Sequence, residues 1–356
     1  MSRFFSEKYA KLAPYTPGEQ PQDMQYVKLN TNESPFPPAP AVVWAAAAEA
    51  ERLQLYSDPE SYDLTRLIAE RYGVAPENVL VGNGSDELLN FAFAAWGDRE
   101  HPFVFPDITY GFYPVFARVN GVPFREIPLR EGFALRVKDF CGVSGNVVIA
   151  NPNAPTGLAL GVSELEEIIA SNPEHVVVID EAYVDFGAES CVPLTKKYDN
   201  LLVVQTFSKS RSLAGGRLGF AIGHASLIQD LNTLKYSTNP YNVNRMTAAC
   251  GAAALREEAY YTANAAVIQA NRIYTALSLK ARGFTVLQSQ ANFLFIRPEF
   301  CAGEALYLGL KERGVLIRHW NRLAIRDWCR VTIGTMEQME AFLAAVDDMM
   351  QKSNEE

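Results

Sequence analysis

The order of apolar and polar positions divides most of the chain into short apolar runs separated by segments with helical spacing. Seven runs follow one another: NVLVG (78–82), PFVF (102–105), FREIPL (124–129), NVVIA (146–150), HVVVID (175–180), LLVVQTF (201–207) and GFAIG (219–223). They are rich in β-branched residues and lack strict polar alternation, which is typical of strands buried on both faces. Intervening segments such as 86–96 and 163–172 have helical spacing. The alternation predicts an α/β domain with a mainly parallel, seven-stranded sheet flanked by helices.

The two ends of the chain have a different pattern. The N-terminal residues are irregular up to a proline-rich segment, which is followed by an alanine-rich stretch that predicts a helix at about 40–54. Near the other end, a long helical stretch at 246–282 precedes four short apolar runs and a terminal helix at 336–351, as in a smaller α+β domain. We therefore expect an N-terminal arm at 1–35 that packs with the small domain or a partner subunit. A large α/β domain would follow at 36–245 and a small α+β domain at 246–356.

Composition places the chain among globular proteins with a large core. It has 356 residues, 48% of them apolar, and this length suggests about two domains. The 32 basic and 41 acidic side chains leave a net charge of -9, which argues against a surface for nucleic acid or an anionic membrane. No apolar run reaches the roughly 18 residues of a membrane span, and MSRFFSEKYAKL lacks the apolar centre of a secretory signal. We expect a cytoplasmic protein.

The cysteines and histidines favour neither disulfides nor a metal site. The five cysteines are odd in number, lie far apart and form no CxxC pair. The four histidines are also widely spaced. Ordinary core or surface positions are the simpler interpretation of all these residues, so we expect no metal.

Polar residues with catalytic potential follow four of the predicted strands. These segments lie at 83–87, 151–157, 180–183 and 208–211, and Arg217 stands just before the last strand. The carboxyl ends of parallel strands meet at one edge of a sheet, where ligands bind. We therefore expect the four segments to lie together around one site.

The loop at 82–87 has features of a phosphate site. Gly84 and Ser85 precede a predicted helix, so free backbone N–H groups and the positive end of the helix dipole would face an anion. The loop matches neither the GxGxxG nor the Walker pattern, which argues against a dinucleotide or a nucleoside triphosphate. Arg217 could clamp phosphate oxygens with two hydrogen bonds. The alternatives are a helix capped by Ser85 or Asp86 and an arginine in solvent.

Asp180 and Lys209 would meet a different part of a ligand. Asp180 directly follows four apolar residues, where a carboxylate is costly unless a cation or hydrogen-bond donors meet it. Lys209 follows another strand and could act as an amine nucleophile that forms a Schiff base with a carbonyl. Taken singly, each could instead be an ordinary surface or capping residue. Together with the phosphate loop they match pyridoxal phosphate, whose ring nitrogen needs Asp180, whose aldehyde needs Lys209, and whose phosphate needs an anion site.

With these residues in place, the chain resembles the fold-type I pyridoxal-phosphate-dependent aminotransferases, and within them the histidinol-phosphate aminotransferase family. The resemblance runs nearly end to end. It is carried by these motifs: PY (14–15), NTNE (30–33), GNGSDE (82–87), DEAY (180–183), SKSRSLAGGR (208–217) and RVTIGT (330–335). It implies a pyridoxal-phosphate cofactor and a homodimer with shared active sites.

The resemblance also implies roles for individual residues around the cofactor. Lys209 would bind the cofactor and carry the proton during transfer, Asp180 would pair with the ring nitrogen, and Tyr183 would contact the ring hydroxyl. Tyr110, in ITYGFY, would stack on the ring face. Tyr56, in QLYSDP, would reach the cofactor phosphate of the neighbouring subunit, although a packing aromatic is the alternative. The phosphate would otherwise be held by Gly84, Ser85, Asp86, Ser208 and Arg217.

The same resemblance implies a substrate site. Arg330 would bind the anionic end of the substrate, and Arg318 and Tyr15 would be further contacts to a substrate phosphate. Asn32 would belong to this site too. For Tyr15, packing is again the alternative.

One position departs from the family pattern. The family has an asparagine immediately before Pro-Thr-Gly that donates to the ring hydroxyl, and this chain has Ala154 there. We predict that the preceding residue, Asn153, contacts the cofactor instead, with water as the alternative, and that Tyr183 carries more of the interaction.

The resulting hypothesis is an aminotransferase of histidine biosynthesis. It would convert histidinol phosphate and 2-oxoglutarate to imidazole-acetol phosphate and glutamate. A threonine-phosphate decarboxylase shares this scaffold and an amino phosphate substrate, and an aromatic amino-acid aminotransferase is a third candidate. A regulator that only binds the cofactor would need a DNA-binding segment, and no part of this sequence has that pattern.

Overall fold

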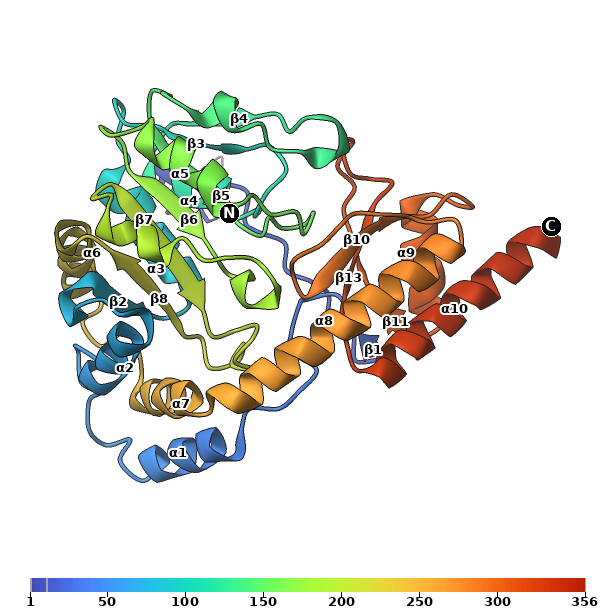
Figure 1. The fold of residues 1–356 in the computed structure, drawn as a ribbon, viewed down its shortest axis with the longest axis horizontal. Coiled ribbons are helices and arrows are strands. Elements are labelled where there is room, and N and C mark those ends of the chain that lie inside the picture. Colours follow the sequence, from blue (N-terminus) through green and yellow to red (C-terminus); the bar gives the residue numbers. More distant parts are fainter. Residues whose placement is uncertain (1, 11, 356) are drawn as a thin grey trace.

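The computed structural model describes residues 2–10 and 12–355, and a seven-stranded sheet forms the centre of its larger part (Figure 1). The strands follow the order β2-β8-β7-β6-β5-β3-β4. β8 is antiparallel to both neighbours, and the other neighbouring pairs are parallel. Each strand lies within or overlaps one expected apolar run: β2 (Val79–Gly82), β3 (Phe103–Pro106), β4 (Phe124–Ile127), β5 (Asn146–Ala150), β6 (Val177–Asp180), β7 (Leu201–Thr206) and β8 (Gly219–Gly223). The prediction of a mainly parallel, seven-stranded sheet is confirmed.

Both faces of this sheet are buried, which explains why the runs lack polar alternation. In β6, Val177 and Ile179 pack on one face and Val178 packs on the other, and all three are fully buried. Burying each such side chain stabilises the fold by roughly 1.5–3 kcal/mol. One face is covered by α2 (Tyr62–Tyr72), α5 (Val162–Ala170) and α7 (Arg245–Arg256). The other is covered by α3 (Ser85–Trp96), α4 (Tyr113–Asn120) and α6 (Ala225–Thr238).

The C-terminal part builds a second core around an antiparallel sheet with strand order β12-β13-β10-β9. Its strands are β9 (Thr285–Val286), β10 (Phe293–Arg297), β12 (Arg318–His319) and β13 (Cys329–Thr332). The helices that pack on this core are α8 (Glu258–Ala281), α9 (Gly303–Glu312) and α10 (Met336–Glu355). Tyr183 and Ala154, which belong to loops of the large sheet, also pack in this core. The two sheets therefore meet where the large sheet presents its loops.

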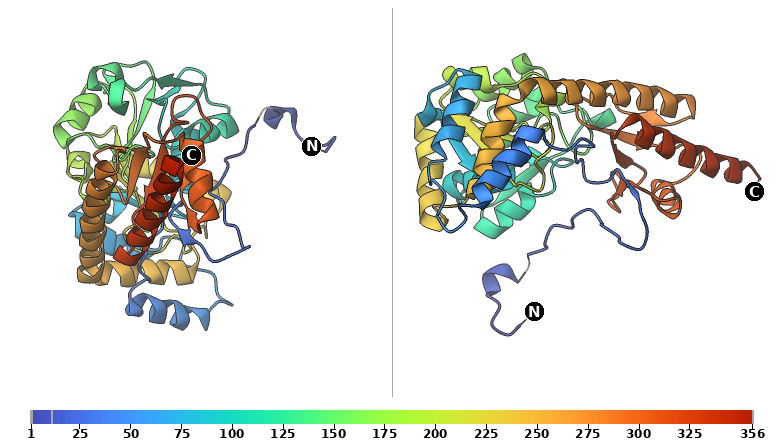
Figure 2. Two further views of the ribbon diagram at one scale, coloured as in Figure 1. Left: turned by 90° about the vertical axis from the view of Figure 1, so that its right-hand side faces the viewer. Right: turned by 90° about the horizontal axis from the view of Figure 1, so that it is seen from below.

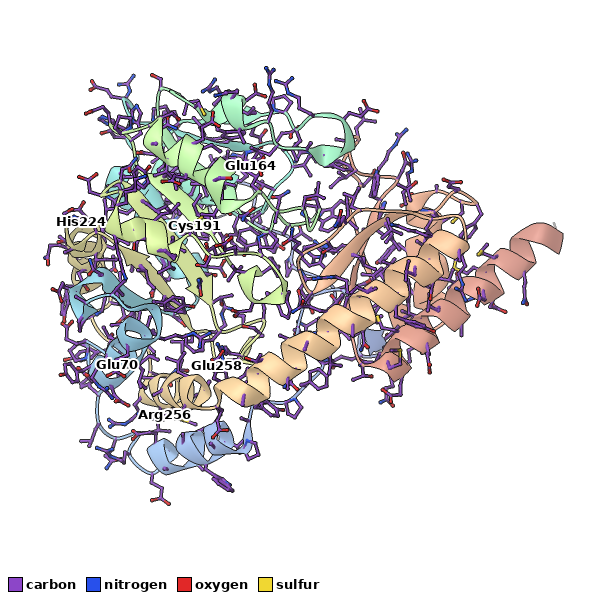
Figure 3. The ribbon with its side chains drawn as sticks, in the orientation of Figure 1. Glu70, Glu164, Cys191, His224, Arg256 and Glu258 are labelled. Atoms are coloured by element: carbon purple, nitrogen blue, oxygen red, sulfur yellow. The ribbon has the colours of Figure 1, made fainter. Side chains whose placement is uncertain are left out.

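The expected helical stretch at 246–282 is two helices. Helical geometry breaks at Glu257, so α7 ends at Arg256 and α8 begins at Glu258. Glu258 pairs with Arg211 at 2.7 Å and with Arg71 at 2.5 Å, and Figure 3 shows it at the end of α8 that lies against the large sheet's helices. The pair with Arg211 attaches the start of α8 to the loop that carries Lys209, and the pair with Arg71 attaches it to α2.

The N-terminal segment crosses to the C-terminal part before the first long helix. β1 (Val27–Lys28) pairs in parallel with β11 (Val315–Leu316), and the Leu29 carbonyl accepts a hydrogen bond from the Thr332 N–H. The chain then returns to α1 (Pro40–Ala50), which packs on α7. Figure 2 shows the first residues extending away from the body of the molecule. Within the described residues, no helix combines the length and apolar character that crossing a membrane requires.

Candidate active site

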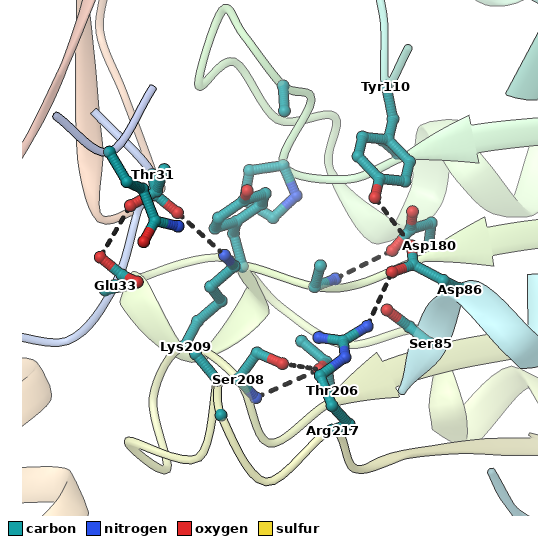
Figure 4. Close-up of a pocket in the computed structure, with 18 residues that line it drawn as sticks. Thr31, Glu33, Ser85, Asp86, Tyr110, Asp180, Thr206, Ser208, Lys209 and Arg217 are labelled. Atoms are coloured by element: carbon teal, nitrogen blue, oxygen red, sulfur yellow. Dashed lines mark hydrogen bonds and ion pairs between the residues drawn. The ribbon is translucent and has the colours of Figure 1, made fainter. Parts of the chain in front are cut away.

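The loops at the carboxyl ends of the strands enclose a cavity of about 350 Å³ (Figure 4). It brings together most of the residues predicted to bind the cofactor: Ser85, Asp86, Tyr110, Asp180, Tyr183, Ser208, Lys209 and Arg217. A second cavity of about 250 Å³ shares Tyr110, Tyr183 and Lys209 with the first. It brings together the residues predicted to bind the substrate: Tyr15, Asn32, Arg318 and Arg330.

Lys209 lies between the two cavities, in the loop after β7. Its Nζ donates a hydrogen bond to the Thr31 carbonyl at 3.4 Å (Figure 4). Burial lowers the pKa of Lys209 to about 8, and the nearby Arg330 guanidinium contributes to this shift while Glu33 opposes it. A much larger fraction of this amine is neutral near physiological pH than for an ordinary lysine, which suits a nucleophile.

Asp180 is a buried carboxylate at the end of β6. Its Oδ2 accepts a hydrogen bond from the Tyr113 hydroxyl at 2.8 Å, and its Oδ1 accepts one from the Ala182 N–H at 3.2 Å. Burial raises the pKa of Asp180 to about 6, although both hydrogen bonds oppose the shift. Among the ion pairs of the described residues none involves Asp180. A buried carboxylate without a cation at the edge of a cavity fits a protonated ring nitrogen.

Tyr113 was not found by the sequence reasoning. It is fully buried in α4 and its ring lies edge-on to that of Tyr110 at 5.6 Å. The signal that could have found it is the second tyrosine of TYGFY, three residues after Tyr110. At that spacing in a helical turn, two side chains share one side of the chain.

The next residue along the strand, Glu181, faces away from the cavity. Its carboxylate accepts hydrogen bonds from the Ser190 hydroxyl at 2.6 Å and from Gln205 Nε2 at 2.8 Å. Burial raises the pKa of Glu181 to about 7. Of the two adjacent acidic residues, only Asp180 is therefore available to a ligand.

The loop before α3 lies beside Arg217 at one end of this cavity. Gly84 has a φ of +82°, in a region of backbone conformation that favours glycine, and the Arg217 guanidinium lies beside it. Gly84 itself does not line the cavity, while Ser85 at the start of α3 does. The first N–H groups of a helix have no partner within it and can bind an anion. Arg217 is half-exposed and pairs with Asp86 at 2.8 Å.

Tyr110 and Ser208 complete this cavity. The Tyr110 hydroxyl donates to Asp86 Oδ1 at 2.7 Å, which holds its ring at the wall of the cavity (Figure 4). The Thr206 hydroxyl donates to Ser208 Oγ at 2.9 Å at the end of β7. Together these residues place hydroxyl groups and one guanidinium at the end of the cavity near α3.

The structure places Asn153, which was predicted to contact the cofactor, outside the cavity that contains Lys209 and Asp180. Its amide donates to the Ile108 carbonyl and to the Thr156 hydroxyl, both at 3.0 Å, and its Oδ1 accepts from the Thr109 hydroxyl at 2.7 Å. These bonds connect the 151–157 turn to the loop after β3, so the side chain faces a different cavity. Ala154, which is 5% exposed, lines the cavity that holds Lys209 and Asp180.

The second cavity contains two adjacent arginines. Arg318 and Arg330 are paired residues of the neighbouring strands β12 and β13. Arg330 Nη2 donates to the Asn30 carbonyl at 3.1 Å, its Nε has no partner, and burial lowers its pKa. Arg318 donates to the Pro17 and Thr16 carbonyls at 2.9 and 2.8 Å. Within the described residues, neither guanidinium has a carboxylate partner, so the pair can hold an anion.

Aromatic residues and one further arginine line the same cavity. Trp320 lies under both guanidinium groups, 5.5 Å from that of Arg318 and 5.3 Å from that of Arg330. Arg322 donates to the Asp107 carbonyl at 2.7 Å. The sequence reasoning did not find these two residues, although they follow Arg318 closely in RHWNR. Tyr15, which was predicted, stacks on Phe112 at 4.2 Å.

Tyr56 lies outside both cavities. It belongs to the segment after α1, is 80% exposed and stacks on Tyr241 at 4.6 Å. The expected contact is with the cofactor of a neighbouring subunit, which a single chain does not test, so the role of Tyr56 stays a prediction.

Comparisons with known proteins agree with this geometry. The family model for aminotransferase class I and II matches residues 24–346. Histidinol-phosphate aminotransferase of Brachyspira hyodysenteriae is 47% identical over 348 residues, which cover 97% of this chain and 98% of that protein. That of Clostridium acetobutylicum is 44% identical over 349 residues, covering 98% and 99%. The crystal structure of histidinol-phosphate aminotransferase from Sinorhizobium meliloti in complex with pyridoxal-5'-phosphate has a TM-score of 0.85 at 22% identity, covering 91% of each chain.

Proposed function

Because the chain belongs to the class I and II aminotransferase family, we propose that it transfers the amino group of histidinol phosphate to 2-oxoglutarate with pyridoxal phosphate as cofactor. The observation that carries the proposal is the pair of joined cavities. One contains a buried amine and a buried carboxylate, Lys209 and Asp180, and the other contains the Arg318 and Arg330 pair. Relatives that are 44–47% identical over nearly their whole length carry the name of this activity.

The residues of the first cavity fit the cofactor. The ring nitrogen would meet Asp180, the ring oxygen would meet Tyr183, and the phosphate would meet the start of α3 with Ser208 and Arg217. When bound, the cofactor supplies an electron sink for the carbon atom that carries the amino group. Asp180 would hold a negative charge beside the ring nitrogen, and Tyr110 would close one face of the ring. Lys209 Nζ would remove the proton from the substrate carbon and return it.

The second cavity fits a substrate that carries a phosphate. A phosphate monoester bears about two negative charges at neutral pH, and two guanidinium groups can each donate two parallel hydrogen bonds to it. An amino acid without phosphate would leave one guanidinium without an anion. The arginine pair therefore favours histidinol phosphate over the substrates of an aromatic amino-acid aminotransferase.

Arg318→Ala is expected to raise the KM for histidinol phosphate by about 10- to 100-fold, because a charge-assisted hydrogen bond contributes roughly 1.5–3 kcal/mol. The KM for a non-phosphorylated aromatic amino acid should change much less. Both values are obtained by following glutamate formation from 2-oxoglutarate. Arg297→Ala is a matched control, since Arg297 is an exposed arginine on β10 outside both cavities.

Two outcomes of this assay would contradict the proposal. Equal changes in both KM values would contradict the assignment of Arg318 to the phosphate and favour a general aromatic aminotransferase. Carbon dioxide release from threonine phosphate, with no glutamate formed, would favour the decarboxylase. The names of the relatives do not favour that alternative.

The proposal includes a homodimer. Large exposed apolar side chains occur on α1, in the segment that follows it and at the start of α2: Val43, Trp44, Leu53, Leu55, Tyr56 and Tyr62. Monomeric proteins seldom expose large apolar patches, so we infer that a second copy of the chain covers these side chains. In such a dimer Tyr56 would reach the partner's cofactor phosphate.

Mixing two inactive variants tests the shared site. Lys209→Ala and Tyr56→Ala subunits should each be poorly active alone at limiting cofactor. Reassembled together, they should recover activity, because one site of each mixed dimer has an intact Lys209 and an intact Tyr56 from the other subunit. A mixture of Lys209→Ala with Asp180→Asn should recover none, because both residues belong to the same subunit's site. No recovery in the first mixture would contradict the role of Tyr56.

A further inference from the structure

Asn32 meets Tyr183 in the wall between the two cavities. Its Nδ2 donates a hydrogen bond to the Tyr183 hydroxyl oxygen at 2.9 Å, across 151 residues of sequence. Asn32 is 1% exposed, and Tyr183 lines both cavities. The side chain therefore has little surface left for a substrate, and its polar contact is with Tyr183.

Other hydrogen bonds fix the direction of the Asn32 amide. The Thr332 hydroxyl oxygen accepts from the Asn32 backbone N–H at 2.9 Å, and the Thr332 hydroxyl donates to Asn32 Oδ1 at 3.0 Å. The reverse orientation of the amide would direct two N–H donors at the Thr332 oxygen and would deprive the Thr332 hydroxyl proton of Oδ1 as its acceptor. Asn292 Nδ2 also donates to the Asn32 carbonyl at 3.1 Å. The network therefore keeps Oδ1 on Thr332 and Nδ2 on Tyr183.

This arrangement determines which way the Tyr183 proton points. Because the phenol oxygen accepts from Asn32, its own proton is free to be donated into the cavity, where Lys209 Nζ lies 5.8 Å from the centre of the Tyr183 ring. The 151–157 turn also borders this cavity but offers it no side-chain donor, since Ala154 lines the cavity and Asn153 faces away. Tyr183 is thus the side-chain donor on this wall, and Asn32 orients it.

We propose that Asn32 is a positioning residue that acts through Tyr183. Because Asn32 Nδ2 donates to the phenol oxygen, the phenol proton is left to point towards the cofactor. The inference rests on the proposed cofactor, and it assigns Asn32 a role other than the substrate contact expected from the sequence. Asn32 belongs to the N-terminal segment, Thr332 to β13 and Tyr183 to the loop after β6. The position of the phenol is therefore set jointly by three parts of the fold.

A second explanation for an asparagine at this position is its backbone conformation. Asn32 has a φ of +56°, in the left-handed region that asparagine and glycine adopt more readily than other residues. Asn32→Gly satisfies this conformation and removes only the amide. Asn32→Asp keeps the acceptor for Thr332 and the approximate shape, but it replaces the donor with a carboxylate oxygen that accepts the Tyr183 proton.

The first measurement uses the cofactor-free protein. Burial raises the pKa of Tyr183, while Arg330 and the Asn32 hydrogen bond lower it and the carboxylates of Asp180 and Asp86 raise it. Labelling with fluorotyrosine makes the phenol observable, and Tyr183→Phe identifies its resonance. Asn32→Gly should raise the pKa of this phenol, and Asn32→Asp should raise it further. An unchanged titration in both variants would overturn the proposal, whatever the substrate of the enzyme is.

The second measurement is a double-mutant cycle on the holoenzyme. Asn32→Gly should weaken cofactor binding and lower kcat by about tenfold each, the size expected for one hydrogen bond, with little change in the KM for histidinol phosphate. In the Tyr183→Phe background the same change should have almost no further effect. An equal loss in both backgrounds, or a change in KM alone, would show that Asn32 does not act through Tyr183.

Discussion

Lys209→Ala is expected to reduce transamination by at least about a thousandfold, because in the proposed mechanism one side chain supplies both the amine nucleophile and the group that moves the proton. The variant should still fold, since its side chain makes one long hydrogen bond to the Thr31 carbonyl. Borohydride reduction of wild-type protein loaded with pyridoxal phosphate should attach the cofactor covalently to Lys209. Peptide mass spectrometry of the two proteins measures this attachment.

The rate of cofactor capture by wild-type protein should also depend on pH in a defined way. The pKa of Lys209 is lowered to about 8, so the neutral fraction of the amine rises about tenfold per pH unit below 8 and levels off above it. For a lysine with the ordinary pKa of 10.5, the neutral fraction and the capture rate would continue to rise up to about that pH. Lys235→Met is a matched control, because Lys235 is also buried with a lowered pKa but lies outside the site. Near-normal turnover of Lys209→Ala would refute the assignment.

Asp180→Asn is expected to lower kcat on the order of a thousandfold, because removing one partner of a buried charge pair costs roughly 3–5 kcal/mol. In the proposed site, the ring nitrogen of the cofactor would no longer be held in its protonated form without this carboxylate. Asp180→Glu retains the charge and should be far milder. Steady-state rates at saturating cofactor compare the three proteins.

Although Asp180→Asn should lower kcat, it should make the cofactor-free protein more stable. Burial raises the folded-state pKa of Asp180 from 3.8 to about 6, so the folded protein binds this proton more tightly than the unfolded chain does. This tighter proton binding contributes fully to the free energy of unfolding below about pH 4, and the contribution is lost as the pH rises through about 6. At pH 8, Asp180→Asn should therefore be more stable than wild type by up to roughly 3 kcal/mol, and the difference should shrink as the pH falls. Denaturant unfolding at several pH values measures this. A variant that is slow and also less stable at pH 8 would indicate a folding defect instead.

Much of the site could be predicted because it follows from local patterns. Strands buried on both faces read as continuous apolar runs, so all seven strands of the large sheet were identified from the sequence. The carboxyl ends of the parallel strands share one edge, which predicted that Asp180, Ser208 and Lys209 would lie together. Ser85 joins them because β2, which is antiparallel to β8, runs in the same direction as β7 and ends at this edge. Arg217 joins them because β8 runs in the opposite direction and begins at the same edge.

The sequence by itself therefore determined the sheet, the edge of the sheet at which the polar loops meet, and most of the polar residues of the cavity that contains Lys209 and Asp180. Only the tertiary structure decided where individual side chains point. Asn153 was predicted to face the cofactor, but its amide makes hydrogen bonds that hold a turn against a neighbouring loop. The contacts of Tyr113 with Asp180 and of Asn32 with Tyr183 join residues 67 and 151 positions apart. The physical reason is that periodicity reports which face of an element is buried, whereas a hydrogen bond depends on distance and direction between groups that only folding brings together.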